Sequence, residues 1–273
     1  MNRQTLIKRF VIGEFSLKRM IRSLIIIYVA VGAWAYFYSE RLIFVPQPSS
    51  YVQTPEFLTL KTVKGVKITA LYLPNSKAKY TILYSHGNAE DLGDNRFLLE
   101  RFRQMGFAVF AYDYPGYGTS EGKPSEQGTY QAIDVAYNYL TQQLKIPPNQ
   151  IIVYGRSVGG GPSVDLASRQ PVGGLVLEST FMSTFRVKID FPLYPFDRFA
   201  NLRKIPFVKA PVLVIHGTID QVIPFSHGQR LFDAVKTPKL SFWLEGANHN
   251  NVIEVAGDRY EQKLQEFIQI IKN

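Results

Sequence analysis

The sequence of 273 residues contains no cysteine. Without thiols the chain cannot form a disulfide, a zinc–thiolate site or a cysteine nucleophile. Histidine is also scarce, with four residues, and His216 and Asp220, although close in sequence, do not form a ligand set at metal spacing. We therefore expect neither a metal nor a cofactor. Internal repeats and low-complexity tracts are missing too, and the length fits one large α/β domain.

Positive charge is concentrated at the N-terminus. The net charge is +9, and residues 1–22 carry six basic residues against the single acid Glu14. The rest of the chain therefore carries only +4. A net charge of +4 over about 250 residues does not form the basic surface that nucleic-acid-binding proteins carry. We therefore expect no nucleic-acid partner.

An uncharged, mostly apolar stretch follows at residues 23–39. Its length in a helix is close to the hydrocarbon thickness of a bilayer, and aromatic residues, which favour the interface, cluster near one end. The basic segment 1–22 contains apolar residues at helical spacing that suit a membrane surface; these are Leu6, Ile7, Phe10 and Val11.

These features predict a single-pass membrane protein with the lipid bilayer as a partner. Residues 1–22 form a basic amphipathic cytoplasmic segment, 23–39 a transmembrane signal anchor, and 40–273 a domain on the opposite, periplasmic or lumenal, side. Two alternatives stay open. The segment "AWA" at residues 33–35 resembles a cleavage site of an export signal, and the apolar stretch also fits a helix buried in a soluble fold.

From about residue 58 onward, apolar strands alternate with amphipathic helices. This order is typical of an α/β protein with a mostly parallel central sheet covered by helices on both faces. An antiparallel hairpin around Lys64 and Gly65 opens the domain at one edge. Ligands of such sheets bind at the carboxyl ends of the strands.

The segment Gly155–Gly159 fits the pattern G-x-S-x-G between a predicted strand and a predicted helix. In this context the pattern is typical of a nucleophile on a sharp turn, which makes Ser157 the candidate nucleophile. The alternatives are a phosphate loop or a tight turn without function. The candidate oxyanion donors are the backbone N–H of Val158, directly after the nucleophile, and the backbone N–H of Asn88 in the turn "SHGNAED".

A serine nucleophile requires a base and an acid that orients the base. His249 follows the last predicted strand and is the candidate base, whereas His86, His216 and His227 fit structural roles. Asp220 is the candidate acid. Glu178 and Asp113 also end strands and remain rivals.

Together these residues resemble the α/β-hydrolase superfamily. The resemblance rests on "SHGNAEDLG", "DYPGYGTSEG", "GRSVGGGPSVDLASR", "PVLVIHGTIDQVIPFSHG" and "EGANHN". More narrowly, the set is similar to membrane-associated serine hydrolases that include protein depalmitoylases and their bacterial relatives. The resemblance implies an α/β-hydrolase fold and a triad at the matching positions Ser157, Asp220 and His249.

Residues 180–209 form a predicted cap-like insertion rich in aromatic residues. We expect Phe181, Phe185, Phe191 and Tyr194 to line a site for an acyl chain, or else to pack the insertion onto the domain. The predicted function is hydrolysis of carboxylic esters or thioesters with acylated or lipid-like substrates. A serine peptidase and a non-enzymatic membrane-tethered binding protein are the alternatives.

Overall fold

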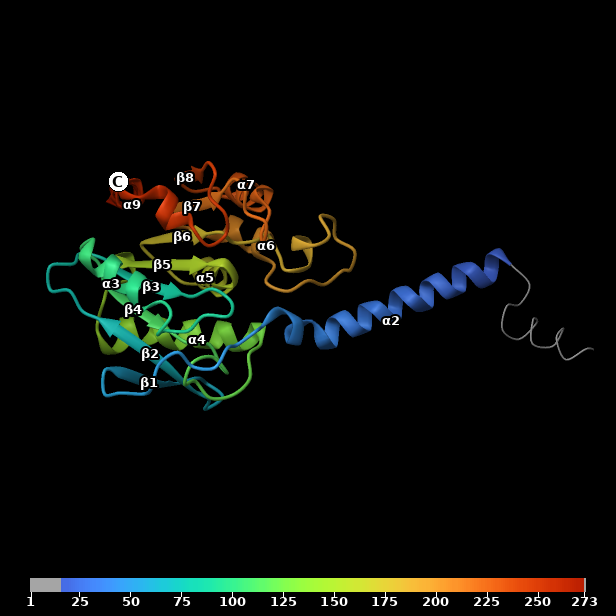
Figure 1. Cartoon of the computed structure of the whole chain (residues 1–273), viewed down its shortest axis with the longest axis horizontal. Coiled ribbons are helices and arrows are strands. Elements are labelled where there is room, and N and C mark those ends of the chain that lie inside the picture. The colour runs from blue at the N-terminus through green and yellow to red at the C-terminus, as the bar shows by residue number, and fades with distance from the viewer. Residues whose placement is uncertain (1–15, 273) are drawn as a thin grey trace, which may run out of the picture. The chain divides into compact units, whose positions relative to one another are not determined.

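The structure, a computed structural model, describes residues 16–272. A sheet of eight strands lies at the centre of this part of the chain (Figure 1). The strands are β1 (Phe57–Lys61), β2 (Lys67–Leu73), β3 (Thr81–Ser85), β4 (Ala108–Tyr112), β5 (Ile151–Arg156), β6 (Gly174–Glu178), β7 (Val212–Gly217) and β8 (Lys239–Leu244). Their order in the sheet is β1-β2-β4-β3-β5-β6-β7-β8. Strands β3 to β8 pair in parallel, whereas β1 pairs with β2, and β2 with β4, in antiparallel orientation.

The predicted opening hairpin is confirmed. Its turn is closed by a 2.8 Å hydrogen bond from the Gly65 N–H to the Thr62 carbonyl. Gly65 has a φ of +78°, a conformation that costs glycine little because it has no Cβ.

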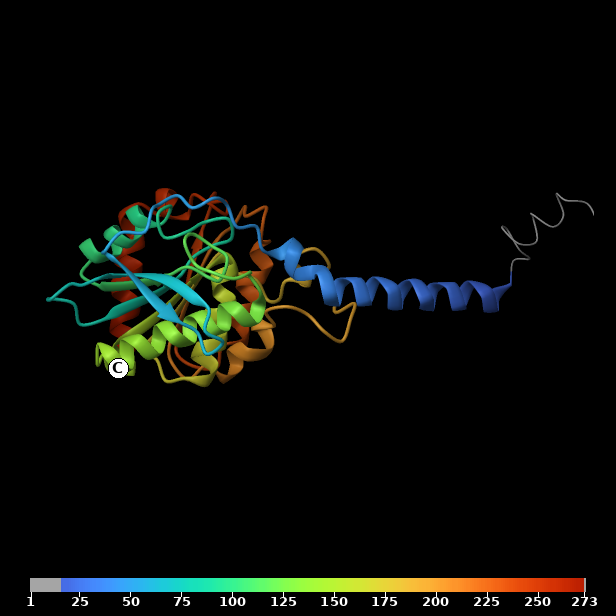
Figure 2. The same ribbon diagram turned by 90° about the horizontal axis from the view of Figure 1, so that it is seen from below.

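Helices cover both faces of the sheet, as predicted (Figure 2). Side chains of α4 (Glu126–Asn138), α5 (Gly160–Arg169) and α7 (Phe225–Ala234) pack in the core of one face. Those of α3 (Arg96–Gln104), α8 (Val252–Ala256) and α9 (Asp258–Lys272) pack in the core of the other. Successive residues of β5 alternate between the two cores, because side chains of a strand point to opposite faces.

Two predicted helices differ in detail from the structure. The sequence predicts one helix from about residue 126 to 145 and another from 158 to 170. The first is α-helical to Asn138 and continues as a wider π-turn at Tyr139–Gln143. The helix expected from residue 158 begins with a 3₁₀ turn at Ser157–Gly159 before α5. Both departures lie where a helix meets its neighbouring loop, a place that hydrophobic periodicity does not resolve.

The insertion between β6 and β7 contains little regular structure. It has one short helix, α6 (Asn201–Lys204), and 3₁₀ turns at Phe185–Val187 and Ile205–Phe207. Figure 1 shows its loop projecting beyond the carboxyl ends of the strands.

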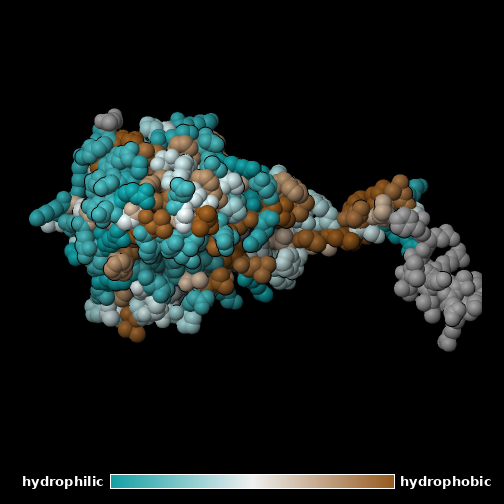
Figure 3. All heavy atoms as spheres, turned by 45° about the horizontal axis from the view of Figure 1, so that its top comes forward, coloured by the Kyte–Doolittle hydropathy of each residue, from teal (hydrophilic) through white to brown (hydrophobic). Residues whose placement is uncertain are grey.

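The N-terminal helix α2 (Leu17–Ile43) extends beyond the predicted span 23–39 at both ends. By length and composition it is a candidate membrane span, and Figure 3 shows it as a band of hydrophobic residues. Its aliphatic side chains are exposed, with Leu24 at 59% and Val29 at 60%. This exposure argues against the alternative of a buried core helix. A second compact unit, which contains the sheet, begins at Ile43. The predicted apolar residues at positions 6–11 lie outside the described residues.

Candidate active site

Ser157 stands on a strained turn at the carboxyl end of β5. Its φ is +53°, which L-residues adopt rarely and which is typical of a strand-to-helix nucleophile turn. A Cβ on Gly159 would lie 2.7 Å from the His86 carbonyl oxygen, and one on Gly155 would lie 2.6 Å from the Ser163 hydroxyl. Only glycine fits at these two positions, and the missing side chains leave room for the sharp turn.

The structure brings His249 and Asp220 to this hydroxyl. His249, in the loop between β8 and α8, places Nε2 3.1 Å from Ser157 Oγ. Its Nδ1 lies 2.8 Å from Oδ2 of Asp220, which follows β7. All three residues are nearly buried, and they follow the carboxyl ends of β5, β7 and β8. Three segments that are distant in sequence therefore meet at the edge of the sheet where the fold places its ligands.

Hydrogen bonds fix the charge on Asp220. Burial alone would raise the pKa of its carboxyl group, but hydrogen bonds from His216 and His249 outweigh burial and hold the pKa far below its usual range. The other oxygen, Oδ1, accepts from the N–H groups of Val222 at 2.9 Å and Ile223 at 2.8 Å. A carboxylate is an acceptor only, so His249 Nδ1 must donate to it. The neutral imidazole then has Nε2 free to accept the Ser157 proton.

The predicted oxyanion donors lie on touching loops. Val158 belongs to the turn after β5, and Asn88 to the loop after the adjacent strand β3. Gly159 packs directly against the backbone of Ser85 and His86, which joins these loops. The Asn88 side chain makes separate contacts, since its amide donates to the Ile43 carbonyl at 2.6 Å and accepts from the Val45 N–H at 3.1 Å. Oxyanion binding by the two N–H groups stays a prediction.

The remaining histidines have structural partners. His86 donates from Nδ1 to the Gly87 carbonyl at 2.8 Å, which shapes the turn after β3. His216 Nε2 lies 2.9 Å from the Ile223 carbonyl, and His227 Nδ1 accepts from the Met182 N–H at 3.1 Å. Burial lowers the pKa of His227, in keeping with a neutral acceptor.

The rival acids are occupied elsewhere. Glu178 Oε2 accepts from the hydroxyls of Tyr154 and Tyr260, each at 2.6 Å. Asp113 accepts from Tyr51 at 2.6 Å and from the Leu92 N–H at 3.0 Å. Neither carboxylate contacts His249, whereas Asp220 does.

A buried ionic cluster behind the triad was missed by the sequence analysis. Arg156, the residue before Ser157, pairs with Glu90 and lies 3.5 Å from Glu178. Its Nη2 also donates to Asn250 Oδ1 at 3.0 Å and approaches the His249 carbonyl at 3.5 Å. Glu90 in turn accepts from the Gly87 N–H at 3.1 Å. One guanidinium thus connects the nucleophile turn, the loop after β3 and the histidine loop. The only signal in the sequence was an arginine beside the motif serine.

The four predicted substrate-binding residues lie in different surroundings. Phe181 is 4% exposed and packs against Phe199, and Phe185 packs against Phe196. Phe191 is 62% exposed. Tyr194 lines a cavity of about 300 Å³ within the insertion. Packing therefore accounts for Phe181 and Phe185, and contact of any of the four with substrate stays a prediction.

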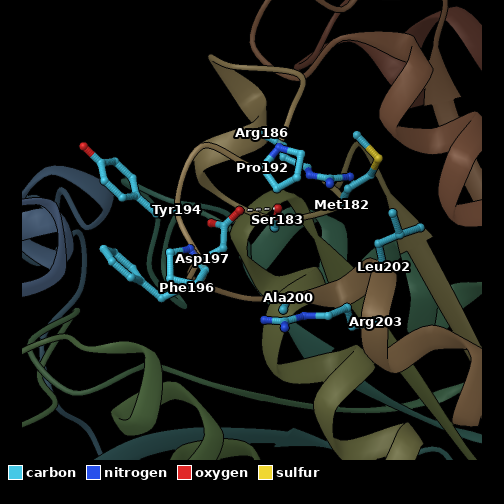
Figure 4. A pocket seen from close by; sticks show the side chains of 11 residues that line it. Met182, Ser183, Arg186, Pro192, Tyr194, Phe196, Asp197, Ala200, Leu202 and Arg203 are labelled. Atoms are coloured by element: carbon cyan, nitrogen blue, oxygen red, sulfur yellow. Dashed lines mark hydrogen bonds between the residues drawn. The ribbon is translucent and has the colours of Figure 1, made fainter. Parts of the chain in front are cut away.

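The lining of this cavity comes entirely from residues 182–203, so the cavity belongs to the insertion. Figure 4 shows Tyr194 and Phe196 on one side and Met182 and Leu202 on the other, with Ser183 donating to Asp197 at 2.6 Å between them. Among residues 16–272, no group of three or more His, Cys, Asp or Glu side chains is placed to hold a metal.

Comparison with known proteins identifies the family. The chain is 44% identical over 218 residues to alpha/beta hydrolase domain-containing protein 17B of Xenopus tropicalis, covering 78% of this chain and 74% of that one. The Homo sapiens protein of the same name is 43% identical with the same coverage. The chain belongs to the α/β-hydrolase family.

Other matches of this α/β-hydrolase are broader. A family described as serine aminopeptidase, S33, matches residues 76–200. An esterase of Pyrococcus furiosus superposes with a TM-score of 0.70 at 20% identity, covering 82% of this chain and 98% of the esterase. Est1E of Butyrivibrio proteoclasticus, with bound ferulic acid, gives 0.65 at 17% identity, covering 78% and 99%. At these identities the solved structures support the fold alone.

Proposed function

We propose that this α/β-hydrolase is a membrane-anchored serine hydrolase that cleaves carboxylic esters or thioesters of acyl chains. The observation that carries the proposal is the continuous hydrogen-bonded series from Ser157 Oγ through His249 to Asp220. A hydroxyl becomes an effective nucleophile when an oriented neutral imidazole accepts its proton.

The chemistry follows from this series. His249 takes the Ser157 proton as Oγ attacks the substrate carbonyl, and Asp220 stabilises the imidazolium that forms. The N–H groups of Val158 and Asn88 stabilise the oxyanion. His249 then gives the proton to the leaving alcohol or thiol, which leaves an acyl group on Ser157. Water, deprotonated by His249, releases the acid and restores the hydroxyl.

A fluorophosphonate probe tests the nucleophile. We expect covalent labelling of the full-length protein and no labelling of Ser157→Ala. The matched control is Ser168→Ala, since Ser168 on α5 donates only to the Asp165 carbonyl at 2.8 Å. Absence of labelling in the wild-type protein would favour a non-enzymatic binding protein instead.

The substrate class is part of the proposal. The resemblance to depalmitoylases and the aromatic insertion favour long acyl groups, with Phe181, Phe185, Phe191 and Tyr194 as the candidate lining. Octanoyl or longer esters and thioesters should be cleaved faster than acetyl esters. Cleavage of aminoacyl anilides in preference to acyl esters would favour a serine peptidase, the second candidate, which the description of the family matching residues 76–200 favours.

Membrane anchoring by α2 completes the proposal. We infer that residues 23–39 span the bilayer, with 1–22 in the cytoplasm and 40–273 on the opposite side. The protein should resist extraction by carbonate and high salt. Because the chain has no cysteine, a Ser76→Cys variant reports sidedness cleanly. An impermeant maleimide should label it from the periplasmic or lumenal side, and labelling only from the cytoplasm would reverse the topology.

A further inference from the structure

The net positive charge of the hydrolase unit, residues 43–273, comes entirely from the insertion at residues 180–209. Residues 43–273 contain 24 basic and 20 acidic residues, and residues 180–209 alone contain six basic and two acidic ones. The remainder of the unit is therefore neutral. Four of the six cations have no ion pair with any residue from 16 to 272; these are Arg186, Lys188, Arg203 and Lys209.

The same insertion exposes large apolar side chains beside these cations. Ile189 is 38% exposed, Phe191 62% and Leu193 40%, all within five residues, and Phe207 is 68% exposed. Exposed aliphatic and aromatic residues interleaved with unpaired cations are typical of protein surfaces that bind anionic lipid.

Contacts within the hydrolase unit place the base of the insertion beside residues 43–45, the first residues of that unit. Phe44 is 4% exposed and packs against Phe199 of the insertion, with ring centroids 6.0 Å apart. The neighbouring Ile43 and Val45 are hydrogen-bonded to the Asn88 side chain in the loop after β3. Residues 43–45, the candidate active site and the insertion thus all lie at the carboxyl edge of the sheet (Figure 1).

We propose that residues 186–193, together with Phe207, dock on the anionic lipid surface of the membrane in which α2 is anchored. The proposal rests on the proposed function, in which α2 spans that membrane. Apolar side chains enter the boundary between headgroups and acyl chains, and the cations contact the anionic headgroups. Docking at this edge turns the Ser157 site toward the bilayer, from which an acylated substrate can reach it.

Site-specific fluorescence in full-length protein tests the docking. The cysteine-free chain allows Phe191→Cys and, separately, Leu193→Cys to be labelled with the environment-sensitive fluorophore NBD. The control is Ser76→Cys, an exposed position in the loop that leads into the opposite, amino edge of β3. Each protein is reconstituted in vesicles of phosphatidylcholine with phosphatidylglycerol, with and without nitroxide-labelled lipid, and flotation verifies that α2 holds the protein in the membrane.

We expect probes at positions 191 and 193 to emit at shorter wavelength and to be quenched several-fold by the nitroxide lipid, with the probe at 76 unaffected. The charge variant Lys188→Glu with Lys209→Glu should reduce this quenching, whereas Lys77→Glu with Lys79→Glu should not. Equal spectra and quenching at all three probe positions would overturn the proposal. A shift at 191 without nitroxide quenching would also overturn it, in favour of contact with a second protein. The measurement needs no turnover, so repeating it with Ser157→Ala separates failure of docking from failure of the proposed hydrolase activity.

Discussion

Replacing Asp220 by asparagine should abolish most activity through the tautomer of His249. Asp220 Oδ1 accepts from the N–H groups of Val222 and Ile223, so an asparagine there must keep its carbonyl oxygen at that position. Its NH₂ group then faces His249 Nδ1, 2.8 Å away. The ring is forced to accept at Nδ1 and carry its proton on Nε2, where it cannot take the proton of Ser157.

A wrong tautomer in such a triad lowers kcat by about 10⁴-fold, equivalent to about 5.4 kcal/mol of transition-state stabilisation. The assay is hydrolysis of 4-nitrophenyl octanoate, with the rate of fluorophosphonate labelling as a second readout. The matched control is Asp134→Asn, which alters an ion pair with Arg169 in which the Asp134 side chain is 38% exposed. Its activity should stay within about twofold of wild type, because exposed pairs contribute little. Retention of more than a tenth of wild-type activity by Asp220→Asn would refute the tautomer argument.

Three further predictions concern the surroundings of the triad. Arg156→Lys should fold, since the positive charge near Glu178 remains. It should nevertheless lower kcat/KM about tenfold, because lysine lacks the forked guanidinium that reaches Asn250. Arg156→Met should also lower the thermal midpoint, because it leaves the buried carboxylate of Glu178 without its cation. Equal kcat/KM in wild type and Arg156→Lys would argue against a positioning role. Burial raises the pKa of Glu90, but pairing with Arg156 outweighs burial and holds that pKa below its ordinary 4.5. The stability that Glu90 contributes is therefore present above pH 4.5 and is lost as the pH falls below 4.5. Urea unfolding between pH 3.5 and about 5.5 should accordingly show a smaller loss of stability for Glu90→Gln than for wild type. Gly159→Ala places a methyl group 2.7 Å from the His86 carbonyl oxygen and should cost about 3 kcal/mol of stability in the same unfolding assay. A variant as stable as wild type would show that the turn after β5 and the loop after β3 can separate.

The sequence was sufficient for the fold class and for the placement of the three candidate catalytic side chains. Each follows an apolar strand, and the carboxyl ends of parallel strands share an edge, so the sequence predicts Ser157, Asp220 and His249 at one place. The glycines around Ser157 added a local signal that does not depend on tertiary structure.

The ionic cluster behind the triad had no such signal. Arg156 meets Glu90 across 66 residues and Asn250 across 94, and neither periodicity nor a motif encodes a pairing over that distance. The sequence predicts a role for the Asn88 backbone. Its side chain, however, bonds the segment that follows α2, in contacts between residues 43 or 45 positions apart. Hydropathy located the apolar stretch of α2 but not its ends, because an α-helix continues through charged residues as readily as through apolar ones.

The most direct test of the account is to trap the acyl group. Full-length protein is mixed with a long-chain acyl thioester, quenched in acid during turnover and digested, and the peptide that contains Ser157 is analysed by mass spectrometry. We expect the added mass of the acyl group on Ser157, and a larger acylated fraction when deacylation is slowed. Turnover with no acyl group on Ser157, or with the acyl group on another residue, would contradict it.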